Sequence, residues 1–546
     1  MKTTCRPAGI HRPKTPAMQW TTVRILRRLH LLLLAIPLAA QAQFDYTTNN
    51  DTITITGYNC TEGPATIPST IDGLPVTTIG GGTFSGCSGL TSVTIPNSVT
   101  SLGAEAFGSC TGLTSVTIGT SVKTLGAHAF ADCTGLASIT IPDSVTDIGA
   151  WAFARCSGLT GVTIPRNVTT IGEQAFFHCT GLGAIEVDAL NSHFGSLNGV
   201  LFDKNLATLI QYLPGRTGGY TIPDGVSTIG DWAFRDCINL ASVAIPNSVT
   251  NIGKGAFVGC KNLPSVVAPD GVTSIGTFAF QGCGSLGSVT LGNSVTTIGR
   301  GAFEGCVSLT NLNIPNSTAN IGSSAFAGCR NLTGVNIPDK VTSIEERTFA
   351  ACASLTNAMI GNSVTNIGDW AFAYCSHLAG VTIPKSVIRI GANAFYGSSL
   401  SSVTIPDGVT AIGNEAFYGS ASLMAVYFMG NAPSEFGRDV FGDSPETILY
   451  YLPGTTGWDS IFVNVQTVLW LPRVQSDDPS FGVRENQFGF NINWASERVV
   501  VVEACPDLAT PVWTPVGTNI LNGGTSYFSD PQWADYPARF YRLRSP

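Results

Sequence analysis

Along most of the chain, hydrophobic and polar positions follow a pattern that repeats every 23 residues. In one unit the hydrophobic residues are Leu90, Val93 and Ile95. The polar residues Ser92 and Thr94 lie between them, so successive side chains alternate between the two faces of an extended backbone. β-Branched residues are frequent here and favour strands. The pattern predicts a short β-strand with one buried and one exposed face in each unit.

The second half of the unit predicts two further elements. Val99 and Leu102 predict a second, shorter extended segment. Ala106, Phe107 and Cys110 have the spacing of one helical turn with an inward face. A single unit cannot bury these residues, but stacked neighbours can. The sequence therefore predicts an α/β repeat solenoid, mostly β, with a parallel β-sheet and short helical turns.

Cysteine marks the period, because one position of the unit is occupied by Cys87, Cys110, Cys133, Cys156, Cys179, Cys237, Cys260, Cys283, Cys306, Cys329, Cys352 and Cys375. The consensus LxxVxIPxSVTxIGxxAFxxC returns in about 14 turns. This string resembles the BspA-type leucine-rich repeats of bacterial surface proteins, over roughly residues 44–471. The resemblance implies a surface or secreted adhesin that binds host or neighbouring-cell proteins. It implies no catalytic residues.

Departures from the period predict the boundaries of the solenoid. Residues 43–74 predict an N-terminal capping turn, and the leucine-rich-repeat solenoid is expected over residues 75–471. Two stretches within it depart from the regular unit. They predict a variant hairpin turn at residues 188–219 and a C-terminal variant turn at residues 428–471.

The C-terminal part of the chain loses the period. Residues 472–480 are polar and contain two prolines, which predicts a linker. Residues 481–546 contain four or five short strand-like segments. They predict a small C-terminal β-rich module, similar to a β-sandwich, whose role could be attachment, secretion or capping.

The N-terminus has the pattern of an export signal. Three arginines precede an apolar run at residues 29–40, and Ala40-Gln41-Ala42 supplies small residues for cleavage before Gln43. We therefore expect a signal peptide at residues 1–42 and a secreted or cell-surface protein. The alternative is an N-terminal membrane anchor. The rest of the chain has no apolar stretch of membrane-spanning length, so we expect no integral span in the mature protein.

Composition and motifs argue against several classes of function. Charged residues are only 12 % of the chain and the formal net charge is −8, which argues against nucleic acid as a partner. No nucleophile, metal-binding or nucleotide-binding motif is present, so we expect no catalytic residues, no cofactor and no metal. The cysteine column favours buried free thiols over disulfides or a metal ladder, because Ser398 and Ser420 continue it. Cys60 and Cys505 lie outside the column and stay unassigned.

Two sets of residues are candidates for a binding surface. The first is a column of outward strand residues, which we call the face column: Thr94, Thr117, Thr140, Thr163, Asn313 and Asn336. The second consists of the turn-side aromatics just before the Ala-Phe pair: Trp151, Trp232, Phe278 and Trp370. Both have a structural alternative. Hydroxyl ladders can simply support a sheet, and the aromatics can pack against adjacent turns.

These observations predict a non-enzymatic, secreted or cell-surface scaffold for protein binding or adhesion. Its expected partners are extracellular proteins or glycans, contacted through the solenoid surface. One alternative is a structural protein of the cell envelope without a specific ligand. Another is an enzyme that carries the C-terminal residues as an appendage. Adhesion depends on the family resemblance, since a repeat fold by itself does not define a function.

Overall fold

The computed structural model describes residues 43–462 and 464–545. The predicted signal peptide, with its cleavage site, lies outside the described residues. Both described ranges are almost entirely β-strands and turns. They form about 17 solenoid turns, somewhat more than the 14 that match the sequence consensus. The predicted repeat solenoid is confirmed.

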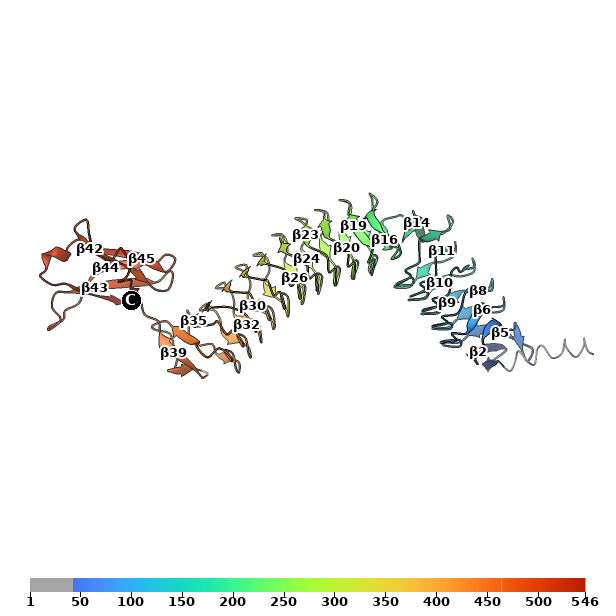
Figure 1. Cartoon of the computed structure of the whole chain (residues 1–546), viewed down its shortest axis with the longest axis horizontal. Coiled ribbons are helices and arrows are strands. Elements are labelled where there is room, and N and C mark those ends of the chain that lie inside the picture. The colour runs from blue at the N-terminus through green and yellow to red at the C-terminus, as the bar shows by residue number, and fades with distance from the viewer. Residues whose placement is uncertain (1–42, 463, 546) are drawn as a thin grey trace, which may run out of the picture. The chain divides into compact units, whose positions relative to one another are not determined.

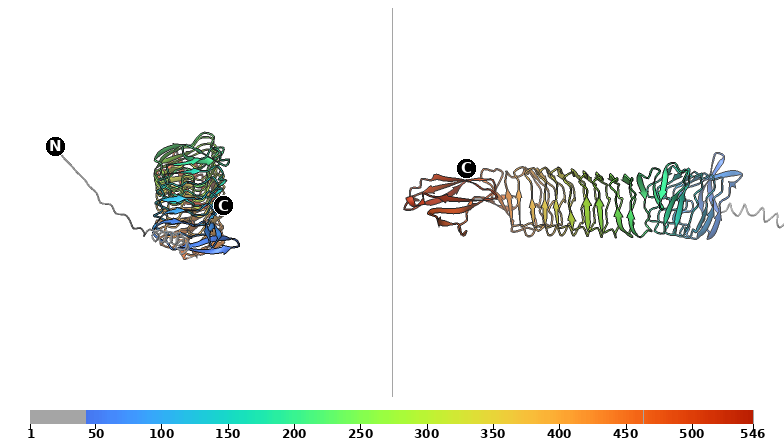
Figure 2. Two further views of the ribbon diagram at one scale, coloured as in Figure 1. Left: turned by 90° about the vertical axis from the view of Figure 1, so that its right-hand side faces the viewer. Right: turned by 90° about the horizontal axis from the view of Figure 1, so that it is seen from above.

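Two compact units divide the chain, and each is described by itself. The first unit runs to Asn205 and includes Leu213–Gly215. The second comprises Leu206–Tyr212 and Arg216–Pro546. In both, successive turns of extended backbone stack on one another (Figures 1 and 2).

In the first unit, most turns contribute strands to two parallel ladders. The wider one, which we call the face ladder, consists of β3 (Gly63–Thr66), β6 (Leu90–Thr94), β8 (Ser115–Thr117), β11 (Gly161–Ile164) and β13 (Ala184–Val187). The short ladder consists of β5 (Leu74–Ile79), β7 (Ser101–Leu102), β9 (Thr124–Leu125), β10 (Asp147–Ile148) and β12 (Thr170–Ile171). Ser92 lies opposite Ser115, so in the regular turns paired strands are one 23-residue unit apart, as the sequence predicts.

Antiparallel strands lie at both ends of the first unit. The remaining strands are β1 (Phe44–Asn49), β2 (Thr52–Tyr58), β4 (Thr70–Ile71), β14 (Phe194–Leu197) and β15 (Val200–Asp203). At the N-terminal end, β1 pairs antiparallel with β2, and β2 pairs parallel with β5. At the other end, β14 and β15 form a hairpin inside the stretch 188–219, where the sequence predicts one.

The second unit also contains a face ladder and a short ladder. Its face ladder consists of β17 (Gly218–Thr221), β19 (Leu240–Ala244), β21 (Ser265–Ala268), β23 (Ser288–Leu291), β25 (Asn311–Leu312), β27 (Gly334–Asn336), β29 (Asn357–Met359), β31 (Gly380–Thr382), β33 (Ser402–Ile405), β35 (Ala425–Phe428), β37 (Ile448–Tyr451) and β39 (Val465–Leu469), which also pairs with β38 (Ile461–Phe462). Its short ladder consists of β16 (Thr208–Gln211), β18 (Thr228–Ile229), β20 (Asn251–Ile252), β22 (Ser274–Ile275), β24 (Thr297–Ile298), β26 (Asn320–Ile321), β28 (Ser343–Ile344), β30 (Asn366–Ile367), β32 (Arg389–Ile390), β34 (Ala411–Ile412) and β36 (Glu435–Phe436).

The core of each unit is a column of stacked phenylalanines. In the second unit Phe257, Phe280 and Phe303 are fully buried, with ring centroids 5.0 and 5.2 Å apart and nearly parallel planes. Offset stacking of this kind adds a favourable ring–ring interaction to the burial of apolar surface. The Leu, Val and Ile positions of the unit are buried around this column.

The expected helical turn is wrong. Among residues 43–462 and 464–545, the only helix is a 3₁₀ turn at Trp533–Asp535. In a typical unit the backbone N–H groups of Glu105 and Phe107 donate to carbonyls of the next turn, at 2.8 Å. The N–H of Ala106 instead donates to Gly103, three residues back. Every second backbone N–H in this segment therefore donates to the neighbouring turn and not to the carbonyl four residues earlier. The hydrogen-bond pattern of an α-helix cannot form.

The cysteine column consists largely of buried free thiols, as the sequence favours. Cys110 and the later members of the column are buried and unbridged. The thiol of Cys110 donates to the carbonyl of Phe84 in the preceding turn, at 3.0 Å, and burial raises the pKa of this thiol to about 11. The first member, Cys87, differs, because it forms a disulfide with Cys60.

The C-terminal strands form two antiparallel sheets. They are β40 (Arg473–Val474), β41 (Gly482–Arg484), β42 (Gln487–Asn493) and β45 (Thr525–Asp530) in one sheet, and β43 (Val499–Cys505), β44 (Thr514–Ile520) and β46 (Phe540–Arg544) in the other. Phe490 and Trp494 belong to their shared core, which also includes Leu452 from the last solenoid turns. The indole N–H of Trp494 donates to the carbonyl of Trp470 at 2.8 Å. Strand β40 lies within residues 472–480, where the sequence predicts a linker.

Candidate binding surfaces

The six residues of the face column are all exposed: Thr94, Thr117, Thr140, Thr163, Asn313 and Asn336. Each lies on the outward side of the face ladder or beside it; Thr140 belongs to a turn without an assigned strand. Their side chains make no hydrogen bond within the described part of the chain, so they do not form a hydroxyl ladder. Their polar atoms are available to a ligand.

Other threonines of the unit have a structural role. The hydroxyl of Thr100 donates to the carbonyl of Thr77 at 3.1 Å, and that of Thr250 donates to Ser227 at 3.2 Å. Both acceptors lie one unit earlier in the chain. These threonines therefore join adjacent turns, and a net contribution of about 1 kcal/mol per bond is typical.

The turn-side aromatics are half-buried and contact adjacent turns. In the first unit, Trp151 stacks on His128 with ring centroids 5.9 Å apart and meets Phe177 edge-on at 4.9 Å. In the second unit, Trp232 lies beneath Arg235 and Lys254, at 4.9 and 5.2 Å from the ring centroid. The packing alternative therefore applies to these side chains, although part of each ring stays exposed.

The other two aromatics show the same behaviour to different degrees. Phe278 has one cation above its ring, Arg300, at 5.9 Å. Trp370 contacts Arg347 at 5.9 Å and two tyrosines, Tyr374 at 6.2 Å and Tyr396 at 5.8 Å. Trp370 therefore lies in a group with tyrosines, whereas the neighbours of Trp151 are histidine and phenylalanine.

The backbone at these positions is left-handed. Trp151, Trp232, Phe278 and Trp370 have φ between 58° and 60°. A bulky residue rarely adopts this conformation, which costs roughly 1–2 kcal/mol relative to glycine. After Trp232 and Phe278 the following unit has glycine at the same position, and a Cβ on Gly255 would lie 2.2 Å from the ring of Trp232. In these two pairs the aromatic ring occupies the space that a side chain in the next turn would need.

Four aromatic residues contact one another on the turn side of the second unit. We call them the aromatic cluster: Trp370, Tyr374, Tyr396 and Tyr418. The rings of Tyr396 and Tyr418 stack 5.2 Å apart, and the side chain of Tyr374 is 52 % exposed. A hydrogen bond to Asp443 raises the pKa of Tyr418 to about 12. Sequence reasoning found Trp370 but missed the tyrosines, which follow the Ala-Phe pair at a spacing of 22 residues.

The face column also continues further than the sequence suggested. Thr404 lies opposite Tyr427, and Tyr427 opposite Tyr450, in the parallel register of β33, β35 and β37. The two tyrosine rings stack 5.1 Å apart, and Trp470 lies 4.5 Å from Tyr427. Tyr450 and Trp470 were missed because residues 428–471 depart from the consensus, and Tyr427 directly precedes that stretch.

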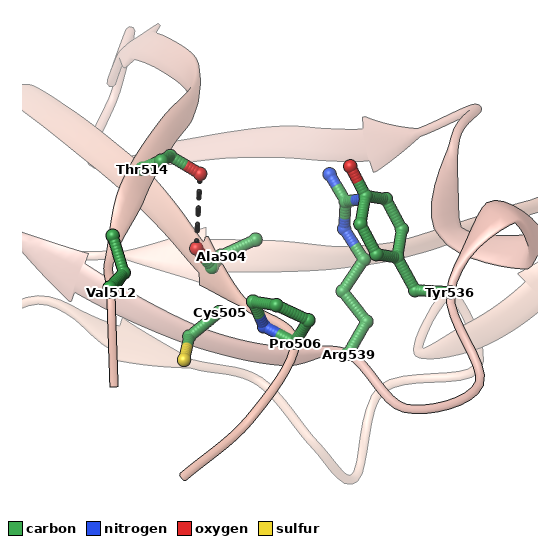
Figure 3. A pocket seen from close by; sticks show the side chains of 7 residues that line it. All are labelled: Ala504, Cys505, Pro506, Val512, Thr514, Tyr536 and Arg539. Carbon is green, nitrogen blue, oxygen red and sulfur yellow. Dashed lines mark hydrogen bonds between the residues drawn. The ribbon is translucent and has the colours of Figure 1, made fainter. Parts of the chain in front are cut away.

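A small pocket of about 220 Å³ lies among the C-terminal strands (Figure 3). Arg539 points into it but is paired with Asp530 at 2.7 Å and lies over the ring of Tyr536 at 4.2 Å. The buried thiol of Cys505 donates to the carbonyl of Asp507 at 2.8 Å. Arg539 and Cys505 thus already have partners within the protein, and we assign no ligand to this pocket.

Neither metal ligation nor a membrane span stands out in the described ranges. Residues 43–462 and 464–545 contain no group of three or more His, Cys, Asp or Glu side chains placed to hold a metal ion. No helix within the same residues has the length and apolar character needed to cross a bilayer.

These features define a parallel β-solenoid of leucine-rich repeats with an uncharged sheet face and aromatic turns. A family model described as BspA type leucine rich repeat region matches residues 66–198, 218–320 and 296–424, in six copies. The matches cover more than half of the chain, which therefore belongs to this family. No curated protein matches it.

Solved structures of bacterial leucine-rich repeat proteins are similar to this chain. A leucine-rich repeat protein from Eubacterium ventriosum is 29% identical over 65% of this chain and 92% of its own, with a TM-score of 0.48. A leucine rich cell surface protein from Faecalibacterium prausnitzii is 31% identical over 58% and 93%, with a TM-score of 0.40. A leucine-rich repeat protein from Bacteroides ovatus is 25% identical over 75% and 94%, with a TM-score of 0.42.

Proposed function

We propose that this protein is a non-enzymatic, secreted or cell-surface scaffold that binds an extracellular protein through the aromatic cluster. The observation that carries the proposal is the composition of that cluster. Trp, Tyr and Arg are the residues most enriched among the energetic centres of protein interfaces. Here Trp370 and three tyrosines lie together, with Arg347 over the indole and Tyr374 more than half exposed.

Charged groups around the cluster favour a protein partner. Arg389 and Asp369 form an exposed ion pair at 3.6 Å, and Asn393 donates to Glu415 at 3.0 Å. A polar rim around an aromatic centre is the usual arrangement of a protein interface.

Localisation outside the cell is part of the same proposal. It is supported by the N-terminal sequence pattern and by the disulfide between Cys60 and Cys87, since disulfides persist mainly in oxidising compartments. Protein recovered from the medium or the cell surface should begin at Gln43. Protein that stays in the cytosol with residues 1–42 intact would contradict this part of the proposal.

Binding is tested with the mature chain immobilised against a panel of extracellular matrix and bacterial surface proteins. The double variant Tyr374→Ser/Arg347→Ser removes exposed atoms and leaves the phenylalanine core intact. We expect it to weaken binding at least tenfold. Tyr527→Ser, which removes a tyrosine 45 % exposed in the C-terminal strands, is the matched control and should bind normally. Binding by the double variant as tight as that of the unsubstituted chain would overturn the proposal. Finding no partner in the panel would also overturn it and would favour a structural envelope protein.

A further inference from the structure

A cleft of about 770 Å³ lies in the second unit, away from the aromatic cluster. Its floor is the outward side of β31 and β33, with Thr382 and Thr404. One wall is formed by the segments that follow these strands, and the other by residues 496–498, which connect β42 to β43. The volume is in the range of sites that bind small molecules and short oligomers.

Contacts between the two walls hold the cleft in place. The ammonium of Lys385 pairs with the carboxylate of Glu497 at 2.5 Å. The guanidinium of Arg498 donates to the carbonyl of Met429 at 3.2 Å. These two contacts join residues 496–498 to the segments that follow the face-ladder strands, and the shared core around Leu452 lies in the same unit.

The charges in the cleft balance. Two cations, Lys385 and Arg498, line it together with two anions, Asp407 and Glu497. A strongly acidic or basic ligand would meet a repulsive group for each attractive one. A ligand without net charge meets two hydrogen-bond donors, Lys385 and Arg498, and two carboxylate acceptors, and none of them repels it.

Hydrogen-bonding capacity on the floor is unused. The hydroxyls of Thr382 and Thr404 are exposed and bond to no residue in the described ranges. The carboxylate of Asp407 is exposed and likewise accepts no hydrogen bond there. A hydroxyl group both donates and accepts, so a polyhydroxylated ligand can satisfy the threonines, the carboxylates and the cations alike.

The position of the cleft argues against an extended peptide. A peptide gains most of its affinity for a sheet by pairing with a free strand edge. This cleft lies over the face of the ladder, where side chains and not backbone groups point toward the ligand. Met429, which is half-buried on the wall, adds apolar surface that suits the C–H face of a sugar ring.

We propose that this cleft is a binding site for a short neutral oligosaccharide. The site is independent of the aromatic cluster, so loss of one should leave the other intact. Recognition depends on Thr382 and Thr404 on the floor and on Asp407 on the wall. The Lys385–Glu497 pair closes one side of the cleft.

The test is calorimetric titration of the mature chain with neutral tetrasaccharides of glucose, mannose, galactose and xylose, and with tetrasaccharides of uronic acids. We expect at least one neutral tetrasaccharide to bind and the acidic ones to bind at least tenfold more weakly. Thr404→Val/Asp407→Asn should weaken binding at least tenfold. Thr290→Val alters an exposed threonine of the same outward column outside the cleft and should change nothing.

Each alternative result contradicts the proposal in a recognisable way. Absence of binding by all neutral tetrasaccharides, or preference for the acidic ones, would refute the assigned ligand class. If Thr404→Val/Asp407→Asn binds the tetrasaccharide as tightly as the unsubstituted chain, the sugar binds outside this cleft and the proposal is wrong. An unchanged circular dichroism spectrum, together with retained protein binding at the aromatic cluster, shows that this variant is folded.

Discussion

Replacing Gly255 with alanine would place a methyl group in the space occupied by the indole ring of Trp232 in the preceding turn. Gly255 has φ +57°, and its Cβ would lie 2.2 Å from two ring carbons of Trp232. The next pair repeats the geometry, since a Cβ on Gly301 would lie 2.5 Å from the ring of Phe278. Gly282 is the matched control, with φ +70° and no atom within 4 Å of the added carbon.

The expected magnitudes differ between the two sites. Left-handed backbone costs an alanine roughly 1–2 kcal/mol relative to glycine, at Gly255 and Gly282 alike. Displacing the indole adds about 1–3 kcal/mol at Gly255 alone, as for other overpacked sites. In a Trp232→Ala background this second contribution disappears. The coupling energy between the two substitutions should therefore be about 1–3 kcal/mol.

Hydrogen exchange measures these effects locally, which suits a solenoid whose turns need not unfold together. The amides of Trp232 and Gly255 donate to carbonyls of the following turns at 2.8 Å and report on this region. We expect Gly255→Ala to lower their protection strongly in the natural background and only modestly beside Trp232→Ala. The same loss in both backgrounds would refute the steric explanation.

Three further outcomes follow from the core, the thiols and the C-terminal sheets. Phe303→Ala removes a fully buried stacked ring and should destabilise the second unit by about 3–5 kcal/mol in denaturant unfolding; a loss below 1 kcal/mol would contradict the stacked core. Burial raises the pKa of Cys110 to about 11, so iodoacetamide at pH 8 should leave it unmodified until denaturant is added, and rapid labelling of folded protein would disagree. Hydrogen bonds from Arg542 and Arg544 hold the pKa of Glu503 below its ordinary value. These hydrogen bonds therefore stabilise the C-terminal sheets fully at pH values above the ordinary pKa of a glutamate, and this stabilisation is lost as the pH falls through the lowered pKa. Tryptophan fluorescence on acidification should show this loss, and Glu503→Gln should reduce its pH dependence; an unchanged profile would rule the carboxylate out.

Much of the solenoid could be predicted from the sequence because every unit must bury the same positions. Leu90, Val93 and Ile95 are buried as expected, and strands pair one 23-residue unit apart. The turn after Gly103 was predicted wrongly. The spacing of Ala106, Phe107 and Cys110 fits a helix, but the donors that decide the conformation bond to the next unit.

The candidate site could be predicted only in part. Trp370 is evident in the sequence as a large residue at a variable position. Tyr396 and Tyr418 become significant only when their units are stacked beside it, since no single unit contains the cluster. The cleft was also beyond sequence reasoning, because it depends on Glu497 meeting Lys385, which is 112 residues away in the chain.

The central claim is that each 23-residue unit forms one rung of a parallel ladder, which places equivalent residues of successive units side by side. Nitroxide amino acids at Ser265 and Asn357, or at Ser265 and Ser402, test it directly by electron–electron resonance without altering the native cysteines. At a strand spacing of ~4.8 Å, four and six rungs predict backbone separations of about 19 and 29 Å, with narrow distributions. Broad distributions, or separations that do not increase by about 10 Å between the two pairs, would contradict the solenoid.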